Sequence, residues 1–184
     1  HLSASDIHDL RIAARRTCHY FENFVTEEHH DLPPDNFQES PAPVVAPRTS
    51  PTNIGVYLLS VVSARDFGWI SLADTINRIE MTMTTIENMP RNRGHLFNWY
   101  DTKTLKPLHP LYISSVDSGN LAGHLVAVAA TCAEWAEAPS VHLQGDFSGV
   151  LDVVGRGSAR ALHRASSRAA MAGVGGPVDT VGAA

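Results

Sequence analysis

Apolar residues recur with helical spacing in four stretches of the chain, and polar loops separate these stretches. The first follows Ser3 and Asp6, which have the spacing of a capping pair, and its apolar stripe fades before Asp31. The second covers residues 52–65, with apolar side chains on one face and Gly68 near its end. Both stretches predict amphipathic helices.

The third and fourth stretches have clearer boundaries. Ser71 and Asp74 form another capping pair, and Pro90 ends the stripe that follows them. The last helix is expected to begin near Ser118 and to end before Pro139. The side chains predicted to face the core from these two helices are Leu72, Ile76, Ile79, Met83, Ile86, Leu121, Leu125, Val128, Cys132 and Trp135.

Long loops join the predicted helices. Residues 31–51 contain six prolines, so they form neither a regular helix nor a central strand. A loop of this length is usually functional or disordered, and the aromatic and amide side chains of residues 35–39 favour an ordered, functional loop. Residues 96–101 are expected to be a short strand or an extended segment. The sequence therefore predicts a mainly helical domain with aromatic-rich loops.

The composition is that of a soluble globular domain. Hydrophobic residues make up 43% and charged residues 18% of the 184 positions, with a formal net charge of −5. This acidic balance argues against a general nucleic-acid binder. No apolar run is long enough to cross a bilayer, so we expect no transmembrane helix, and no signal-peptide pattern is present at the start.

Metal, redox and nucleotide chemistry gain little support from the sequence. Cys18 and Cys132 fall in predicted helices, where a free thiol usually behaves as a small hydrophobe. The ten histidines, including the adjacent His29 and His30, match no zinc-binding spacing. A serine-nucleophile elbow and a glycine-rich phosphate loop are both missing from the sequence. We expect no metal and no cofactor.

Three polar clusters lie in the loops next to the predicted helices. They are Arg48–Asn53, Asn98–Asp101 and Ser114–Asn120, and they offer hydroxyl, amide and carboxylate groups. The second cluster adds aromatic rings. Sugars need this combination, because amides and carboxylates bind their hydroxyls and flat rings bind their C–H faces. Helix N-termini add backbone N–H donors.

Asp101 and Asp117 allow two interpretations. As carboxylates of a glycoside site they would flank the bond that reacts. Alternatively, Asp117 caps the last helix and Asp101 stabilises a turn before Thr102. Both interpretations stay open, because a cap at the wall of a pocket also contacts a sugar.

Five motifs follow one another along the chain: Leu32–Glu39, Arg48–Gly55, Arg65–Ile70, Arg93–Thr102 and Ser114–Gly123. In this order, and over residues 2–155, the sequence resembles the central glucoamylase-like region of bacterial cyclic β-1,2-glucan synthases. The order of five separate motifs makes a chance match very improbable.

The resemblance implies a large inner-membrane parent protein with a glucosyltransferase domain that uses UDP-glucose. Its central region, of (α/α)6-barrel type, transglycosylates β-1,2-glucan and closes the ring, and a C-terminal phosphorylase-like domain trims chain length. Residues 1–155 would then be an incomplete (α/α)6 barrel, the first few helices of a glucoamylase-like toroid with long loops. The implied partners are a β-1,2-glucan oligosaccharide and the remaining domains of the parent, on the cytoplasmic side of the bacterial inner membrane.

The resemblance also implies which residues bind substrate, because the three polar clusters line the glucan-binding cleft in this family. The family's catalytic glutamates are expected beyond the end of this chain, so Glu80, Glu87, Glu134 and Glu137 are not nominated and the catalytic residues stay unassigned. The chain would thus be a binding wall without its catalytic pair. The implied substrate-binding residues are Arg48, Thr49, Asn53, Asn98, Trp99, Tyr100, Asp101, Asp117 and Asn120.

The family-like pattern stops after Gly155. Residues 156–184 are rich in Gly, Ala, Ser and Arg, which predicts a low-complexity tail that is disordered or translated from a shifted reading frame. Its arginines at positions 156, 160, 164 and 168 would share one face of a helix, but no apolar stripe supports such a helix.

Two alternatives to the transglycosylase remain open. A hydrolase of the same barrel type, an endo-β-1,2-glucanase, would use water as the acceptor in place of a sugar hydroxyl. A non-catalytic segment would only bind glucan or hold neighbouring domains together.

Overall fold

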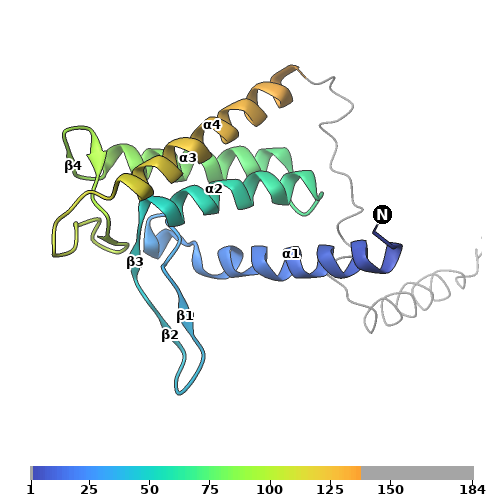
Figure 1. The fold of residues 1–184 in the computed structure, drawn as a ribbon, viewed down its shortest axis with the longest axis horizontal. Helices are drawn as coiled ribbons and strands as arrows, with labels where there is room; N and C mark the ends of the chain where they lie inside the picture. The colour runs from blue at the N-terminus through green and yellow to red at the C-terminus, as the bar shows by residue number, and fades with distance from the viewer. Residues whose placement is uncertain (1, 138–184) are drawn as a thin grey trace, which may run out of the picture.

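The computed structural model describes residues 2–137, which form four α-helices: α1 (Ala4–Phe24), α2 (Pro51–Asp66), α3 (Leu72–Asn88) and α4 (Ser115–Glu137). A short 3-10 turn, η1 (Glu27–His29), follows α1. Successive helices reverse direction, so that α2 and α4 begin at the same end of the molecule (Figure 1). The predicted tail at 156–184 lies outside the described residues.

Three short antiparallel strand pairs occupy the end at which α2 and α4 begin (Figure 1). They join β1 (Phe37–Gln38) to β2 (Val44–Val45), β3 (Arg48–Thr49) to β6 (Tyr100–Asp101), and β4 (Arg91–Asn92) to β5 (His95–Leu96). In the β3–β6 pair, Arg48 lies opposite Asp101 and Thr49 opposite Tyr100. This pairing brings the first two predicted polar clusters together.

Side-chain caps define the helix starts much as the sequence predicts. Ser3 Oγ accepts from the Asp6 N–H in a complete capping box, and Ser71 Oγ accepts from the Asp74 N–H. The fourth helix begins at Ser115, three residues before the predicted start. The reason is that Ser114 Oγ accepts the N–H of Asp117, at 3.1 Å, so an earlier serine of the same run closes the first turn.

Helix α2 is the centre of the fold, because it packs against α1, α3 and α4. Its side chains are therefore buried on several sides, and the single apolar face predicted for it is too narrow. The three core side chains that best show this are Ile54, Leu58 and Val62. The rest of the buried apolar cluster comes from Leu32, Ile86, Met89, Leu96, Tyr100, Leu121 and Val128.

The predicted apolar stripe of α3 is partly wrong. Ile76 is 43% exposed, whereas Thr75 and Thr82 are wholly buried. These threonines tolerate burial because their hydroxyls donate to the backbone oxygens of Ser71 and Asp31, at 2.8 and 3.0 Å. The other inward side chains of α3 that pack on the core, and those of α4, are confirmed: Ile79, Met83, Ile86, Leu121, Leu125, Val128, Cys132 and Trp135.

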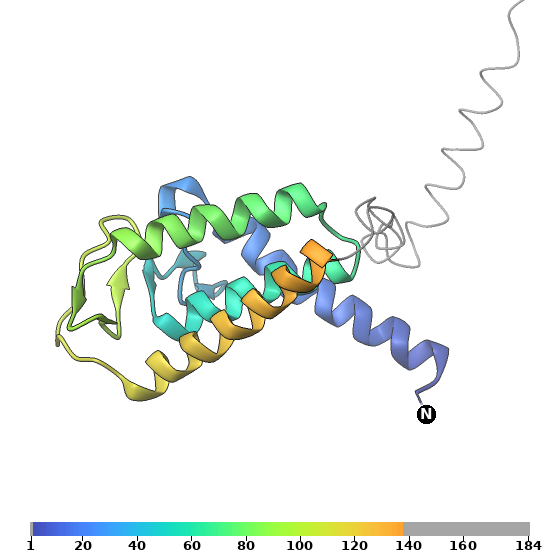
Figure 2. The same cartoon turned by 90° about the horizontal axis from the view of Figure 1, so that it is seen from above.

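The four helices leave part of their apolar surface open. Helix α1 runs on beyond the other helices toward the N-terminus (Figure 2), where Leu2, Ile7 and Leu10 are each at least half exposed. Val126 on α4 is 71% exposed. Within residues 2–137, no helix is both long and apolar enough to span a bilayer. Cys18 and Cys132 are free thiols on α1 and α4.

Candidate functional site

The first turns of α2 and α4 are joined by polar side chains. Thr52 Oγ1 donates to Asp117 Oδ1 at 2.6 Å, and Asn120 Nδ2 donates to Thr52 Oγ1 at 3.1 Å. Asp117 is therefore not the cap that one interpretation of the sequence predicts, because Ser114 has that role. The Asp117 carboxylate instead points across to α2.

Asn98 holds the second oxygen of Asp117. With its amide turned to satisfy its neighbours, Asn98 donates to Asp117 Oδ2 at 2.9 Å and accepts from Tyr112 OH and Trp99 Nε1, at 2.6 and 2.7 Å. The Asn98 backbone N–H also donates to the Tyr112 carbonyl at 2.9 Å. The Asp117 carboxylate is thus fixed from two sides by groups that are themselves oriented.

A second polar group lies on the neighbouring loop. Arg48 donates through Nε and Nη2 to Asp35 Oδ2, at 3.1 and 2.8 Å, and Asn53 Nδ2 donates to Asp35 Oδ1 at 3.3 Å. The Arg48 guanidinium carbon lies 4.8 Å from the centre of the Trp99 ring, over its face. Trp99 therefore connects this ion pair to the Asp117 network.

Three of the residues implied as substrate contacts have mainly structural partners. Thr49 and Tyr100 are wholly buried in the β3–β6 pair. Tyr100 OH donates to the Pro90 carbonyl and accepts the Phe97 N–H, at 2.6 and 2.7 Å. Asp101 Oδ1 accepts the backbone N–H groups of residues 103 and 104, which closes the turn that the sequence suggested.

The pKa of Asp101 reflects this turn. Partial burial acts to raise it, but the hydrogen bonds from Thr104 and Lys103 outweigh burial and hold the pKa below its ordinary value. The Asp101 carboxylate therefore favours its ionised form, and it accepts its hydrogen bonds from residues of its own turn. It does not join the Asp117 network.

The site contains three residues that the implied set lacks: Asp35, Thr52 and Tyr112. Asp35 and Thr52 lie inside motifs already singled out, and Thr52 directly precedes Asn53 of the implied set. Tyr112 follows a stretch broken by prolines, and its role depends on a contact with Asn98 fourteen positions earlier, which no local pattern encodes.

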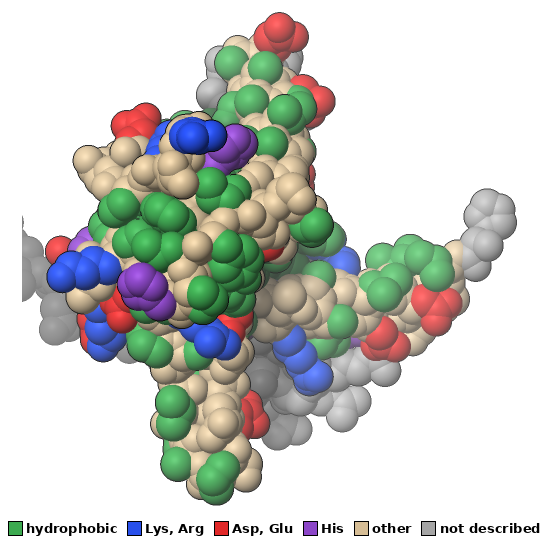
Figure 3. All heavy atoms as spheres, turned by 60° about the vertical axis from the view of Figure 1, so that its left-hand side comes forward, with side chains coloured by type: hydrophobic (Ala, Val, Ile, Leu, Met, Phe, Trp, Pro, Cys, Tyr) green, Lys and Arg blue, Asp and Glu red, His purple; other side chains and the backbone are tan. Residues whose placement is uncertain are grey.

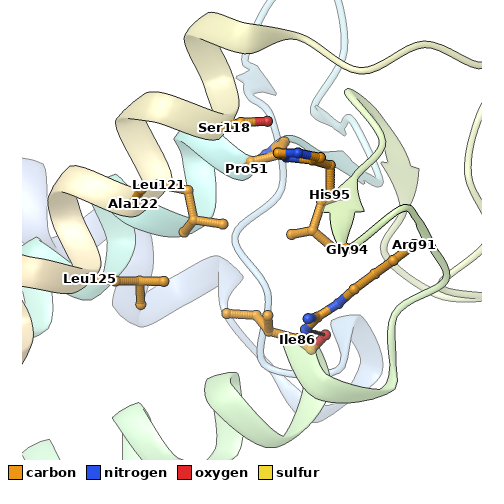
Figure 4. Close-up of a pocket in the computed structure, with 10 residues that line it drawn as sticks. Pro51, Ile86, Arg91, Gly94, His95, Ser118, Leu121, Ala122 and Leu125 are labelled. Carbon is orange, nitrogen blue, oxygen red and sulfur yellow. Dashed lines mark hydrogen bonds between the residues drawn. The ribbon is translucent and has the colours of Figure 1, made fainter.

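A cavity of about 200 Å³ lies beside this site, between the β4–β5 hairpin and helices α3 and α4 (Figure 4). Leu121 and Leu125 of α4 line one side, opposite Ile86 and Arg91. Arg91 Nη2 donates to the Ile86 carbonyl at 2.9 Å. Viewed from this end, hydrophobic side chains gather at the centre and charged side chains and histidines surround them (Figure 3).

The histidines of the described part are not arranged for a metal. No group of three or more His, Cys, Asp or Glu side chains in residues 2–137 is placed to hold a metal ion. His29 is buried, and its Nδ1 lies 2.6 Å from Thr102 Oγ1. His30 Nδ1 lies 2.8 Å from the Thr102 carbonyl. Both rings tie the η1 turn to the segment after β6.

The helical arrangement is that of glucoamylase-like proteins. Two solved glucoamylase-like structures, from Bacteroides fragilis and Bacteroides caccae, match with TM-scores of 0.58 and 0.55 at 20% and 18% identity. An endo-beta-1,2-glucanase from Chitinophaga pinensis, solved with sophorotriose and glucose, matches with a TM-score of 0.53 at 16% identity. Each match covers 73% of this chain and 33%, 34% and 36% of those chains, respectively. The fold is thus part of a glucoamylase-like α/α toroid, as the resemblance implied.

The sequence itself gives the closer relationship. The chain is 64% identical over 152 residues to the cyclic beta-(1,2)-glucan synthase NdvB of Rhizobium meliloti. The match covers 83% of this chain but 5% of that synthase. No protein-family model matches the chain. The chain is therefore homologous to one segment of a cyclic β-1,2-glucan synthase, which confirms the resemblance read from the five motifs.

Proposed function

We propose that this chain forms one wall of the glucan-binding cleft in the transglycosylating and cyclising region of a cyclic β-1,2-glucan synthase. The observation that carries the proposal is the hydrogen-bond network of Asp117, Thr52 and Asn98, which joins the starts of α2 and α4. The chain that contains this network is homologous to a segment of such a synthase. The parent would act at the cytoplasmic side of the inner membrane, with its remaining domains as partners.

The exposed groups of this network suit the hydroxyls of a glucan. Asn120 and Tyr112 are exposed, and half of the Arg48 side chain is open to solvent. Asp117 retains acceptor capacity, because a carboxylate has about four lone-pair sites and the described partners use two. Since neighbouring side chains already hold these groups, binding a sugar costs little further side-chain entropy.

The chain supplies binding and orientation in this proposal. Cleavage and re-formation of a glycosidic bond with retention need two carboxyl groups about 5 Å apart. Asp117 accepts hydrogen bonds from Thr52 and Asn98, and Asp35 accepts hydrogen bonds from Arg48 and Asn53, so both carboxylates are held in place by neighbouring donors and suit a binding role. We place the acid/base and nucleophilic carboxylates in the rest of the parent protein.

The direct test is the binding of linear β-1,2-gluco-oligosaccharides to the full 184-residue chain, measured by calorimetry. Asp117→Asn replaces the carboxylate, whose charged oxygens would accept hydrogen bonds from sugar hydroxyls, with a neutral amide. The affinity for the glucan should therefore fall about tenfold. Asp9→Asn, on the exposed face of α1, is the matched control and should bind as the wild type does. Circular dichroism establishes that each variant is folded. A folded wild-type chain that binds no glucan, or an Asp117→Asn variant that binds as well as the wild type, would contradict the proposal.

A further inference from the structure

Arg48 occupies a position that a stacked sugar would otherwise take. Its guanidinium lies over the face of Trp99, with 4.8 Å between the guanidinium carbon and the ring centre. At least one face of this indole is therefore covered by protein. The described residues offer no hydrogen-bond partner to Arg48 Nη1, whereas Nε and Nη2 both donate to Asp35.

Asp35 is the residue that fixes this arrangement. Asp35 Oδ2 accepts both Arg48 donors and also Asn36 Nδ2, the last at 3.0 Å, and Oδ1 accepts from Asn53 Nδ2 at 3.3 Å. The Asp35 side chain is 19% exposed, against 50% for Arg48, so the carboxylate lies beneath the guanidinium that it holds.

The backbone around Asp35 is held as well. The Asp35 N–H donates to the Ala46 carbonyl at 3.3 Å, and the Ala46 N–H donates to the Asn36 carbonyl at 2.9 Å. The antiparallel segments next to β1 and β2 therefore also hold the backbone of Asp35 in place. A guanidinium presents its donors in a planar fork, so an acceptor that fixes two of them also fixes the direction of the rest.

From this geometry we propose that Asp35 is a positioning residue for the glucan site: it holds Arg48 stacked on Trp99, with Nη1 directed at glucan hydroxyls, and holds Asn53 beside it. The inference rests on the proposed glucan-binding function and specifies how the site is built. In this arrangement the glucan hydroxyls contact the hydrogen-bond donors of Arg48 and Asn53. The covered face of Trp99 supports the Arg48 guanidinium and does not stack on a sugar.

The first measurement needs no glucan. The chain has three tryptophans, so labelling with 5-fluorotryptophan gives three 19F resonances, and Trp99→Phe assigns the relevant one. Asp35→Asn keeps the side-chain shape but removes the charge, and Arg48→Ala removes the stacked group. Both should shift the Trp99 resonance and leave those of Trp69 and Trp135 in place. Glu39→Gln, an exposed carboxylate of the same loop, is the control and should shift none.

The second measurement is a double-mutant cycle for binding of linear β-1,2-gluco-oligosaccharides. Asp35→Asn and Arg48→Ala should each weaken binding about tenfold. Asp35→Asn keeps a side-chain oxygen that can accept from Asn53 Nδ2, so its loss of affinity should arise through Arg48, and the double variant should bind no more weakly than Arg48→Ala alone. A residue that merely stabilises the loop would give additive losses.

The results of these two measurements distinguish the positioning role of Asp35 from the proposed glucan-binding function. A Trp99 resonance that is unchanged in Asp35→Asn, or additive losses in the cycle, overturns the positioning role while the glucan site stands. A folded wild-type chain without glucan affinity overturns the proposed function and the glucan-directed role of Arg48 together. In that case a shift of the Trp99 resonance would still show that Asp35 holds Arg48 on the ring.

Discussion

The hydroxyl of Thr52 donates to Oδ1 of Asp117 over 2.6 Å, and this single contact joins residues 65 positions apart in the sequence. Thr52 lies in the first turn of α2 and Asp117 in the first turn of α4. The polar network of the candidate site is therefore also part of the packing between the two helices. Changes at the site are expected to affect stability as well as binding.

Replacing Thr52 by Val tests this double role. The substitution keeps the side-chain shape but leaves Asp117 Oδ1 without its donor, so the free energy of unfolding should fall by about 1–2 kcal/mol. Urea denaturation measures the change. Thr84→Val, at an exposed position of α3, is the matched control and should alter stability by less than about 0.5 kcal/mol. Equal effects of the two substitutions would show that the Thr52–Asp117 contact contributes nothing.

Gly55→Ala tests the close approach of α2 to α4. A Cβ added at Gly55 would lie 2.2 Å from His124 Nδ1, so the helices would have to separate or the imidazole would have to turn. Overpacking of this kind typically costs about 1–3 kcal/mol. Gly119→Ala is the control, because nothing lies within 4 Å of the added atom, and it should be neutral or slightly stabilising.

Repeating Gly55→Ala in a second variant shows whether the His124 side chain causes the loss of stability. In a His124→Ala variant the side chain that opposes the new Cβ is gone, so Gly55→Ala should cost much less there than in the wild type. Thermal unfolding of the wild type, the two single variants and the double variant provides the comparison. An unchanged cost would mean that the backbone of α4, rather than His124, limits the approach.

Thr49→Val separates the buried strand pair from the proposed sugar-binding surface. Thr49 is wholly buried, and its Oγ1 has no hydrogen-bond partner among residues 2–137. Replacing the hydroxyl by a methyl group should therefore leave stability unchanged or raise it by up to about 1 kcal/mol. Affinity for β-1,2-gluco-oligosaccharides should stay at the wild-type value. A marked loss of affinity in a stable variant would show that the Thr49 hydroxyl takes part in binding after all.

His29 gives the fold a predictable dependence on pH. Burial lowers the pKa of His29 below its ordinary value. The negative charges of Glu28 and Asp101 act to raise this pKa, but burial outweighs them. The unfolded chain then binds the proton more readily, so His29 contributes stability that is present above its unfolded pKa of about 6.5 and is lost as the pH falls below that value. His29→Asn should flatten the decline of the unfolding free energy between about pH 7 and pH 5. A slope equal to that of the wild type would contradict this assignment.

Local signals predicted the helices well. Ser3 with Asp6 and Ser71 with Asp74 are contacts between near neighbours, so their effect on helix starts depends little on the rest of the fold. The burial of Thr75 and Thr82 was not predictable in this way. Periodicity treats a threonine as polar, whereas its hydroxyl here finds a backbone acceptor.

The candidate site was predictable in part, for the same reason. Its loops stand out by composition, and the resemblance names most of its exposed residues. The contacts that set the role of each residue join distant segments, as Asp35 with Arg48 and Thr52 with Asp117 do. Composition therefore did not show that Tyr100 lies in the core or that Arg48 covers Trp99.

The proposed function requires that glucan binds at the starts of α2 and α4. The most direct test is a 1H–15N NMR titration of the chain with linear β-1,2-gluco-oligosaccharides, with β-1,4-linked oligosaccharides of equal length for comparison. We predict saturable shifts of the side-chain amides of Asn53 and Asn120 and of the Trp99 indole N–H with the β-1,2-linked sugar. Shifts confined to the cavity beside Leu121 and Leu125, or no saturable shift from a folded chain, would contradict the account.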